Sequence, residues 1–153
     1  MIGTKLISKN RRAYFDYEIL DEFEAGIVLT GAEVKAVKNG QINLRDSFVR
    51  ISQNTVILWN ADISKYIYSS DPNYDPIRSR KLLLKKREIG SLISKSKASR
   101  LTIIPLKVYL KRGRVKILIG LAKGRRVHEK KARQKERDLD RELHREKRKY
   151  MLK

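Results

Sequence analysis

Residues 101–121 read LTIIPLKVYLKRGRVKILIGL, and this stretch decides the fold class. Towards the end of 101–110, apolar and polar residues alternate, as they do in half-buried strands. Residues 115–121 are a mostly apolar run with β-branched residues. Between them, Lys111-Arg112-Gly113-Arg114 has the composition of a tight turn. The pattern predicts a long β-hairpin. Pro105 is expected at a sheet edge or a bulge, because proline cannot donate a hydrogen bond to a central ladder.

Further strands are predicted upstream of this hairpin. Segments 47–52 and 55–63 are rich in β-branched and aromatic residues, and Gln53-Asn54 separates them, which predicts a second hairpin. Residues 17–29 mix apolar and acidic residues and read as two strand-like pieces. Gly26 is expected at the bulge or corner between the two pieces.

Two helices, a loop and a basic arm complete the local predictions. Thr30-Gly31-Ala32-Glu33 has the form of a capping box and Asn39-Gly40 is a typical stop signal, so a short helix is expected between them. Apolar residues near helical spacing predict a second helix over 80–97. Residues 64–80 contain many turn-forming Ser, Asp, Asn and Pro residues, which predict an exposed loop. Residues 5–12 are expected to be a basic arm that enters the first strand.

The predicted elements favour one small domain. About six strands with two or three flanking helices suit a mainly β fold, a closed barrel of the oligonucleotide-binding type. A chain of 153 residues accommodates that barrel and an extension. We therefore predict a barrel domain over 1–123 and a basic C-terminal tail over 124–153.

The tail differs sharply in composition from the rest. Residues 125–153 contain thirteen Lys or Arg and six Asp or Glu, a net charge of +7, and few large apolar side chains. Such a segment has no core of its own, although its residues are good helix formers with opposite charges three and four positions apart. We expect it to be disordered when free and helical on a partner.

Charge indicates the class of partner. The chain carries 37 Lys and Arg against 17 Asp and Glu, a formal net charge of +20, whereas about 2 to 8 suffices to keep a small domain soluble. A polyanion is the expected partner, and nucleic acid fits better than a membrane surface because the basic tail lacks an opposite apolar face. The absence of cysteine, of a long apolar run and of an export signal predicts a cytoplasmic protein.

Enzyme motifs are scarce. The two histidines, His128 and His144, both lie in the tail, and neither a phosphate-binding glycine loop nor a zinc-protease motif occurs. We predict no catalysis, no cofactor and no metal site. The enzyme alternative is a nuclease that uses Asp21, Glu22 and Glu24 as acid and base. Lys and Arg to neutralise phosphates, with aromatic rings to stack on unpaired bases, favour RNA binding instead. The candidate rings are Tyr14, Phe15, Tyr17, Tyr66 and Tyr74.

Several long motifs together resemble a known family. The segments are NRRAY at 10–14, FEAGIVLTGAEVK at 23–35, DPIRSRKLLL at 75–84 and GLAKGRR at 120–126. In order and spacing they resemble small protein B, the bacterial tmRNA-binding or SsrA-binding family, over nearly the whole chain. The resemblance implies a non-enzymatic adaptor that binds the tRNA-like domain of tmRNA and delivers it to stalled ribosomes, where trans-translation tags the nascent peptide. It also implies elongation factor Tu and alanyl-tRNA synthetase as indirect partners.

The resemblance assigns tmRNA contacts residue by residue. Glu24, Leu83 and Lys116 match family positions implicated in tmRNA binding. Phe15 stands where the family often has His, and Lys85 where it commonly has Asn or His, so neither hydrogen-bonding role transfers, although Phe15 can still stack on a base. The full expected tmRNA-binding set is Asn10, Arg11, Arg12, Phe15, Tyr17, Glu24, Lys35, Arg80, Lys81, Leu83, Lys85 and Lys116.

The resemblance also implies that the tail binds the ribosome. His128-Glu129-Lys130-Lys131 occupies the place of a family group of the same charge pattern, so His128 would stack in the decoding centre while the lysines meet rRNA phosphates. Residues 132–149 would form a helix in the empty mRNA channel. The expected ribosome-binding set is Lys123, Gly124, Arg125, Arg126, His128, Glu129, Lys130 and Lys131.

The alternative function is that of a ribosomal protein whose basic extension threads permanently into rRNA. Composition does not separate the two readings. A ribosomal protein would copurify stoichiometrically with all ribosomes, whereas an adaptor would be substoichiometric and follow tmRNA. A monomer is expected in either case, because no apolar surface stripe is left over.

Overall fold

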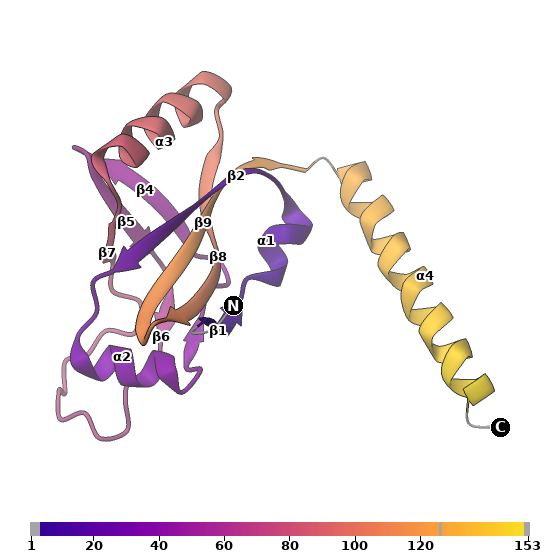
Figure 1. Cartoon of the computed structure of the whole chain (residues 1–153), viewed down its shortest axis with the longest axis horizontal. Coiled ribbons are helices and arrows are strands. Elements are labelled where there is room, and N and C mark those ends of the chain that lie inside the picture. The colour runs from indigo at the N-terminus through magenta and orange to yellow at the C-terminus, as the bar shows by residue number, and fades with distance from the viewer. Residues whose placement is uncertain (1–3, 126, 152–153) are drawn as a thin grey trace.

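Figure 1 shows a computed structural model of the chain, which describes residues 4–125 and 127–151. The first elements are β1 (Thr4–Lys9), α1 (Arg11–Asp16), β2 (Tyr17–Ile27), α2 (Gly31–Lys38), β3 (Ile42–Asn43), β4 (Phe48–Ser52) and β5 (Thr55–Trp59). They are followed by β6 (Asp62–Ile63), β7 (Arg80–Leu83), α3 (Lys86–Ser99), β8 (Thr102–Lys111), β9 (Arg114–Gly124) and α4 (Val127–Met151). In the described part of the chain, no helix is long and apolar enough to cross a membrane.

Six antiparallel strands close into a barrel. The pairing runs from β8 through β4, β5, β7, β2 and β9 and returns to β8, while β1 adds to the free side of β8. The β2–β9 ladder is long, from Tyr17↔Gly124 to Gly26↔Lys116. The β4–β8 seam has one register pair, Val49↔Ile103. The predicted mainly β barrel of about six strands is confirmed.

The barrel interior is filled by alternate residues of its strands. Val56, Leu58, Leu82, Ile117 and Ile119 are all buried, while their strand neighbours point outwards. Burial of such aliphatic side chains contributes about 1.5 to 3 kcal/mol each. This interior core stabilises the closed barrel in a chain that has no cysteine.

A second, smaller core lies outside the barrel, where α1 packs. Ala13 of α1 contacts Ile104 and Leu106 of β8 and Ala122 of β9. Gly120 allows this close packing, because a Cβ there would lie 2.8 Å from Leu106 Cδ1. The N-terminal helix is thereby fixed to the outer surface of the barrel.

Both predicted hairpins are confirmed. Arg112 and Gly113 join β8 to β9 with φ of 53° and 77°, and Gln53 and Asn54 join β4 to β5 with φ of 49° and 62°. Two successive residues of positive φ match the twist of antiparallel strands. Pro105 lies at a register shift between β8 and β9, as the bulge prediction required.

Three predictions about the early strands and the second helix were wrong. Residues 5–12 are not a free arm, since β1 pairs with β8 and α1 begins at Arg11. Gly26 is not a corner, since β2 continues to Ile27 and its irregularity lies between Ile19 and Asp21. Residues 80–83 form strand β7, because alternate side chains there enter the barrel core, and α3 begins only at Lys86.

The capping-box helix is confirmed as α2. The Thr30 hydroxyl accepts from the Glu33 amide at 3.2 Å, and the Glu33 carboxylate accepts from the Thr30 amide at 3.0 Å. Gly40 ends the segment with φ of 79°, in the left-handed region that glycine tolerates. The local sequence signals therefore define both ends of this helix.

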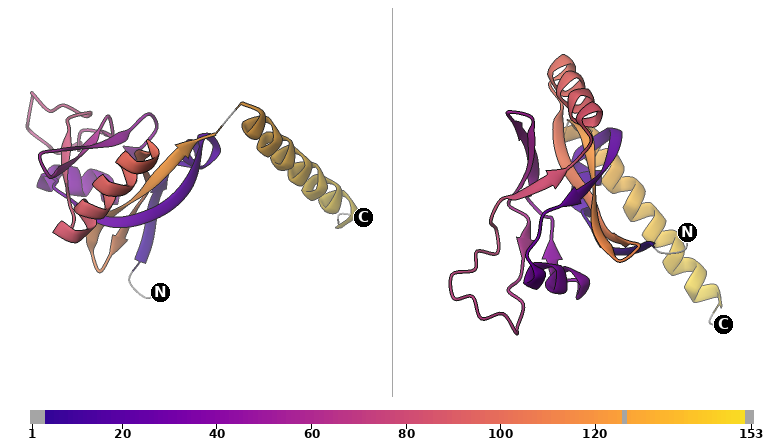
Figure 2. Two further views of the ribbon diagram at one scale, coloured as in Figure 1. Left: turned by 90° about the horizontal axis from the view of Figure 1, so that it is seen from above. Right: turned by 60° about the vertical axis from the view of Figure 1, so that its left-hand side comes forward.

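The tail forms one long helix. α4 projects away from the barrel, as the two views of Figure 2 show. The helical form expected of the tail is present, while its disorder in the free chain stays a prediction. The domain bounds 1–123 and 124–153 also stay predictions; β9 itself continues to Gly124.

Candidate RNA interface

Glu24, Leu83 and Lys116 meet on one outer face of the barrel. Gly26 of β2 pairs with Lys116 on one side and with Leu83 on the other. Glu24 lies two residues from Gly26 and so points to the same face of the sheet. Leu83 is 53% exposed although it is apolar. Strand pairing thus assembles three residues that lie far apart in the sequence, and we call their surface the Glu24 face.

Glu24 is held by two neighbours on this face. The Tyr109 hydroxyl donates to Glu24 Oε2, and Lys111 Nζ lies 3.3 Å from Glu24 Oε1. The hydrogen bond from Tyr109 lowers the pKa of Glu24, helped by Lys111 and Lys116 against the opposing effect of partial burial. Burial and the bond to Glu24 raise the pKa of Tyr109. The face therefore presents an ionised carboxylate in a fixed position among cations.

Sequence reasoning missed Tyr109 and Lys111. Both belong to the 101–121 hairpin, in which Tyr109 pairs with Lys116 and Lys111 with Arg114. Directly opposed residues of an antiparallel pair share a face, so the predicted turn at 111–114 was a sufficient signal to place Tyr109 beside Lys116.

The cations of α1 form a second basic area. Arg11 and Arg12 are exposed, and Arg12 pairs with Asp16 at 3.0 Å. The centre of the Phe15 ring is 5.9 Å from Arg12 Cζ and 5.5 Å from Arg137 Cζ. Phe15 therefore links α1 to α4, and its ability to stack on a base remains a prediction.

Asn10 is buried instead of being part of an exposed RNA-binding arm. It is 8% exposed, its Nδ2 donates to the Pro105 carbonyl at 2.9 Å, and its Oδ1 accepts from the Ala13 amide. It caps α1 and ties it to β8. These hydrogen bonds give Asn10 a structural role, and its direct contact with RNA stays a prediction.

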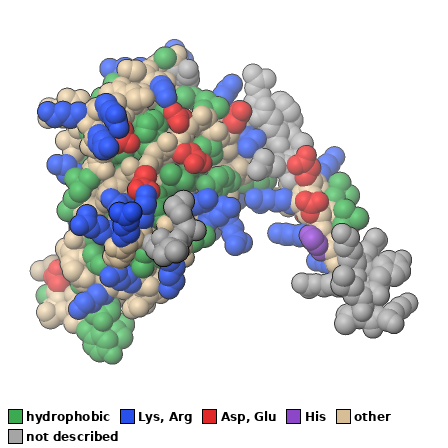
Figure 3. Space-filling model, viewed as in Figure 1, with side chains coloured by type: hydrophobic (Ala, Val, Ile, Leu, Met, Phe, Trp, Pro, Cys, Tyr) green, Lys and Arg blue, Asp and Glu red, His purple; other side chains and the backbone are tan. Residues whose placement is uncertain are grey.

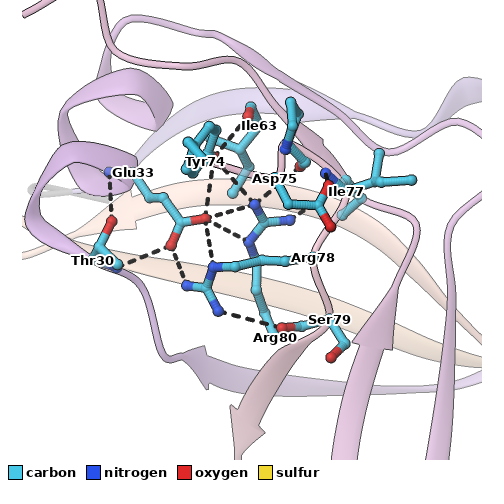
Figure 4. Close-up of polar contacts among 11 residues, drawn as sticks. Thr30, Glu33, Ile63, Tyr74, Asp75, Ile77, Arg78, Ser79 and Arg80 are labelled. Atoms are coloured by element: carbon cyan, nitrogen blue, oxygen red, sulfur yellow. Dashed lines mark hydrogen bonds and ion pairs between the residues drawn. The ribbon is translucent and has the colours of Figure 1, made fainter. Parts of the chain in front are cut away.

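Arg80, which was also expected to bind tmRNA, lies inside the fold. Its side chain is fully buried inside the polar cluster of Figure 4, where it donates to Glu33 Oε2 from Nε at 2.9 Å and from Nη2 at 2.6 Å. Arg78 donates to both carboxylate oxygens of Glu33, and the Tyr74 hydroxyl donates to the Ile63 carbonyl at 2.8 Å. Arg80 and Tyr74 thus anchor the 64–79 loop to α2, with Arg80 fully buried and the Tyr74 ring partly exposed.

The cluster sets the protonation of Glu33. Burial would raise the pKa of Glu33, but hydrogen bonds from Arg78, the Thr30 amide and Arg80 outweigh it and lower the pKa to about 2. The carboxylate is therefore ionised at neutral pH and forms ion pairs with two guanidinium groups, one of them fully buried.

The low pKa of Glu33 makes the stability of the fold depend on pH. Because the folded pKa of about 2 is below the ordinary 4.5, Glu33 stabilises the fold fully above about pH 4.5 and loses that contribution as pH falls towards 2. The loss corresponds to roughly 3 kcal/mol. Urea unfolding between pH 6 and pH 2.5 measures it. Glu33→Gln should flatten the curve, and an unchanged pH dependence in that variant contradicts the assignment.

The remaining residues of the expected tmRNA-binding set are spread around the barrel. Lys35 is exposed on α2 with its Nζ 5.6 Å from the Tyr66 ring centroid, and Tyr17 is half-buried where α1 ends. Lys81 is exposed on β7, and Lys85 is exposed at the start of α3. In the view of Figure 3, blue Lys and Arg side chains lie at several places on the barrel and along α4. These cations are therefore not confined to the Glu24 face.

The expected ribosome-binding residues lie at the junction of barrel and tail. Lys123 and Gly124 end β9, and the Arg125 amide donates to the Asp16 carbonyl at 2.9 Å. Arg126 lies outside the described residues. The backbone of residues 128–131 forms the beginning of α4, and the Lys131 side chain is exposed.

The nuclease alternative needs an acid and base pair among Asp21, Glu22 and Glu24, and the structure gives these carboxylates separate partners. Asp21 accepts from Lys95 of α3 at 2.5 Å, which lowers the pKa of Asp21, whereas Glu24 is engaged by Tyr109. Glu22 is exposed. Over residues 4–125 and 127–151, no group of three or more His, Cys, Asp or Glu is placed to hold a metal ion. The geometry favours a binding surface over a hydrolytic site.

Comparison with known proteins points to one family. The profile of the SmpB protein family matches residues 7–149. The SsrA-binding protein of Enterococcus faecalis is 48% identical over 141 residues, 92% of either chain, and that of Persephonella marina is 51% identical over 142 residues, 93% of either chain. A solved structure described as "tmRNA-SmpB: a journey to the center of the bacterial ribosome" superposes with a TM-score of 0.65 and 45% identity, over 78% of this chain and 85% of that one.

Proposed function

Because the chain belongs to the SmpB protein family, we propose that it is an RNA-binding adaptor of trans-translation, which binds the tRNA-like domain of tmRNA and delivers it to stalled ribosomes. The observation that carries the proposal is the convergence of Glu24, Leu83 and Lys116 on one outer face of a barrel whose structure is similar to a tmRNA-bound relative.

The Glu24 face has the chemistry for a structured RNA. Lys111 and Lys116 neutralise phosphates, and Leu83 offers an apolar contact to a sugar or base. Glu24 is an acceptor with a fixed direction, so it selects an amino group of a base and repels a misplaced phosphate. Lysines supply affinity while the carboxylate supplies selectivity.

The tail serves the ribosome in this proposal. α4 carries cations and acids around its circumference and, in the described positions, exposed side chains throughout, as a helix surrounded by RNA requires. The beginning of α4 then occupies the decoding centre, and its remainder the mRNA channel. Elongation factor Tu and alanyl-tRNA synthetase act through tmRNA, and the protein acts as a monomer in the cytoplasm.

A binding titration distinguishes the role of the barrel from that of the tail. The buried core draws no described residue from α4, so a chain ending at Lys123 should retain the barrel. Both chains should bind tmRNA selectively against an unrelated structured RNA at two salt concentrations, and the full chain alone should associate with ribosomes. Equal binding to both RNAs, or loss of all binding with the tail, contradicts the proposal. Stoichiometric association with every ribosome would support the ribosomal-protein alternative.

A further inference from the structure

A large hollow lies in the surface of the barrel. It has a volume of about 710 Å³ and opens between β4, the last turns of α3 and the start of β8. It exists because the β4–β8 seam has one register pair, so the sheet is not continuous there. In the pairing cycle β4 is three strands from β2 in either direction, so Phe48 and Arg50 lie away from the Glu24 face, although Tyr17 at the start of β2 also lines the hollow.

The lining combines an aromatic ring with unpaired cations. Phe48 contributes its ring, and the Arg50 guanidinium carbon lies 4.9 Å from the centre of that ring. Lys97 of α3 faces the same hollow, and neither Asp nor Glu lines it. Among the described residues, Arg50 and Lys97 make no ion pair. Two cations face a hollow of mixed apolar and polar lining, without an acid to balance them.

An exposed indole adjoins the hollow. Trp59 pairs directly with Phe48 across β4 and β5, so the two rings share the outer face of the sheet. Trp59 is 39% exposed, which is unusual for the residue with the largest apolar surface. Aromatic rings on neighbouring strands with basic residues beside them form the stacking platforms that bind single-stranded RNA.

We propose that this hollow is a second RNA site, which takes one unpaired nucleotide. The base stacks on Phe48 inside the hollow, its phosphates meet Arg50 and Lys97, and the adjacent nucleotide lies against Trp59. Its volume falls in the range of small-ligand sites. The site extends the proposed function, because it allows the barrel to hold tmRNA on the Glu24 face and a second RNA strand at the hollow.

Trp59 is the single tryptophan of the chain and therefore reports on the site directly. Titration of the full chain with a short unstructured oligouridine should quench its fluorescence. Phe48→Leu should weaken the affinity about tenfold, the loss of one stacked base. Arg50→Gln changes only an exposed side chain, so it should fold normally, weaken binding several-fold and reduce the salt dependence by about one phosphate contact.

Lys38→Gln is the matched control. It removes one cation from the exposed end of α2, outside the hollow, and should leave the oligouridine affinity within about twofold. Equal weakening by Lys38→Gln and Arg50→Gln would overturn the site, as would equal quenching by a polyglutamate of the same charge. Binding to tmRNA should be unchanged in Phe48→Leu, so a failure of this site and a failure of the Glu24 face give different results.

Discussion

Replacement of Glu33 by alanine should lower the free energy of unfolding by about 3 to 5 kcal/mol, as expected when one partner of a buried ion pair is removed. The Glu33 carboxylate is fully buried, and it forms ion pairs with Arg80, which is also fully buried, and with Arg78, whose side chain is 34% exposed. Without it, two guanidinium groups remain under the 64–79 loop with only carbonyl and hydroxyl acceptors. Against a typical total of about 5 to 15 kcal/mol, the loss is measurable by urea denaturation.

Helix α3 supplies a matched control. Glu88 accepts from the Lys85 amide at 3.0 Å there, as Glu33 does from Thr30, although Lys85 has no side-chain acceptor to complete a capping box, and no arginine pairs with Glu88 among the described contacts. Glu88→Ala should therefore cost about 1 kcal/mol, the effect of a cap alone. If Glu33→Ala costs no more than Glu88→Ala, then Glu33 acts only as a helix cap and the buried cluster contributes nothing to stability.

The elements that the sequence predicts well are those with local signals. The capping box of Thr30 and Glu33 and the two hairpin turns depend on residues within four positions of one another, and all three are present. The tail helix follows similarly from local composition. For these elements tertiary packing agrees with local preference.

The elements that were predicted wrongly depend on distant contacts. Helix α1 begins after Asn10, whose amide reaches carbonyls 34 and 95 residues away. Residues 80–83 are too few for strand and helix periodicity to be told apart, and the barrel partners β5 and β2 decide the outcome.

Distant contacts also explain why the sequence did not predict how the site residues are arranged. Arg80 belongs to a run of basic residues and was expected to bind RNA, but its partner Glu33 is 47 residues away. Glu24, Leu83 and Lys116 were selected from the family resemblance, and only the strand register brings them together. The hollow that Phe48 lines could not be predicted from the sequence, because it arises from an incomplete seam between β4 and β8.

Glu24→Ala should reduce the preference for tmRNA more strongly than any other single change on the Glu24 face. The carboxylate is ionised, oriented by Tyr109 and Lys111, and repels phosphates that approach it wrongly. Its removal loses one charge-assisted contact to a base and frees both neighbours, so affinity for tmRNA should fall about tenfold or more. Affinity for an unrelated RNA should rise slightly, because the face becomes more positive.

The opposite signs of these two effects separate selectivity from general charge attraction. Glu18 is an exposed acid on the same strand, outside the contacts of Tyr109 and Lys111, so Glu18→Ala changes the net charge equally. That variant should bind both RNAs slightly more tightly. Competition titrations of tmRNA against the unrelated RNA at constant salt measure the ratio. If Glu24→Ala strengthens both affinities as Glu18→Ala does, the carboxylate makes no selective contact, and the Glu24 face binds RNA by charge alone.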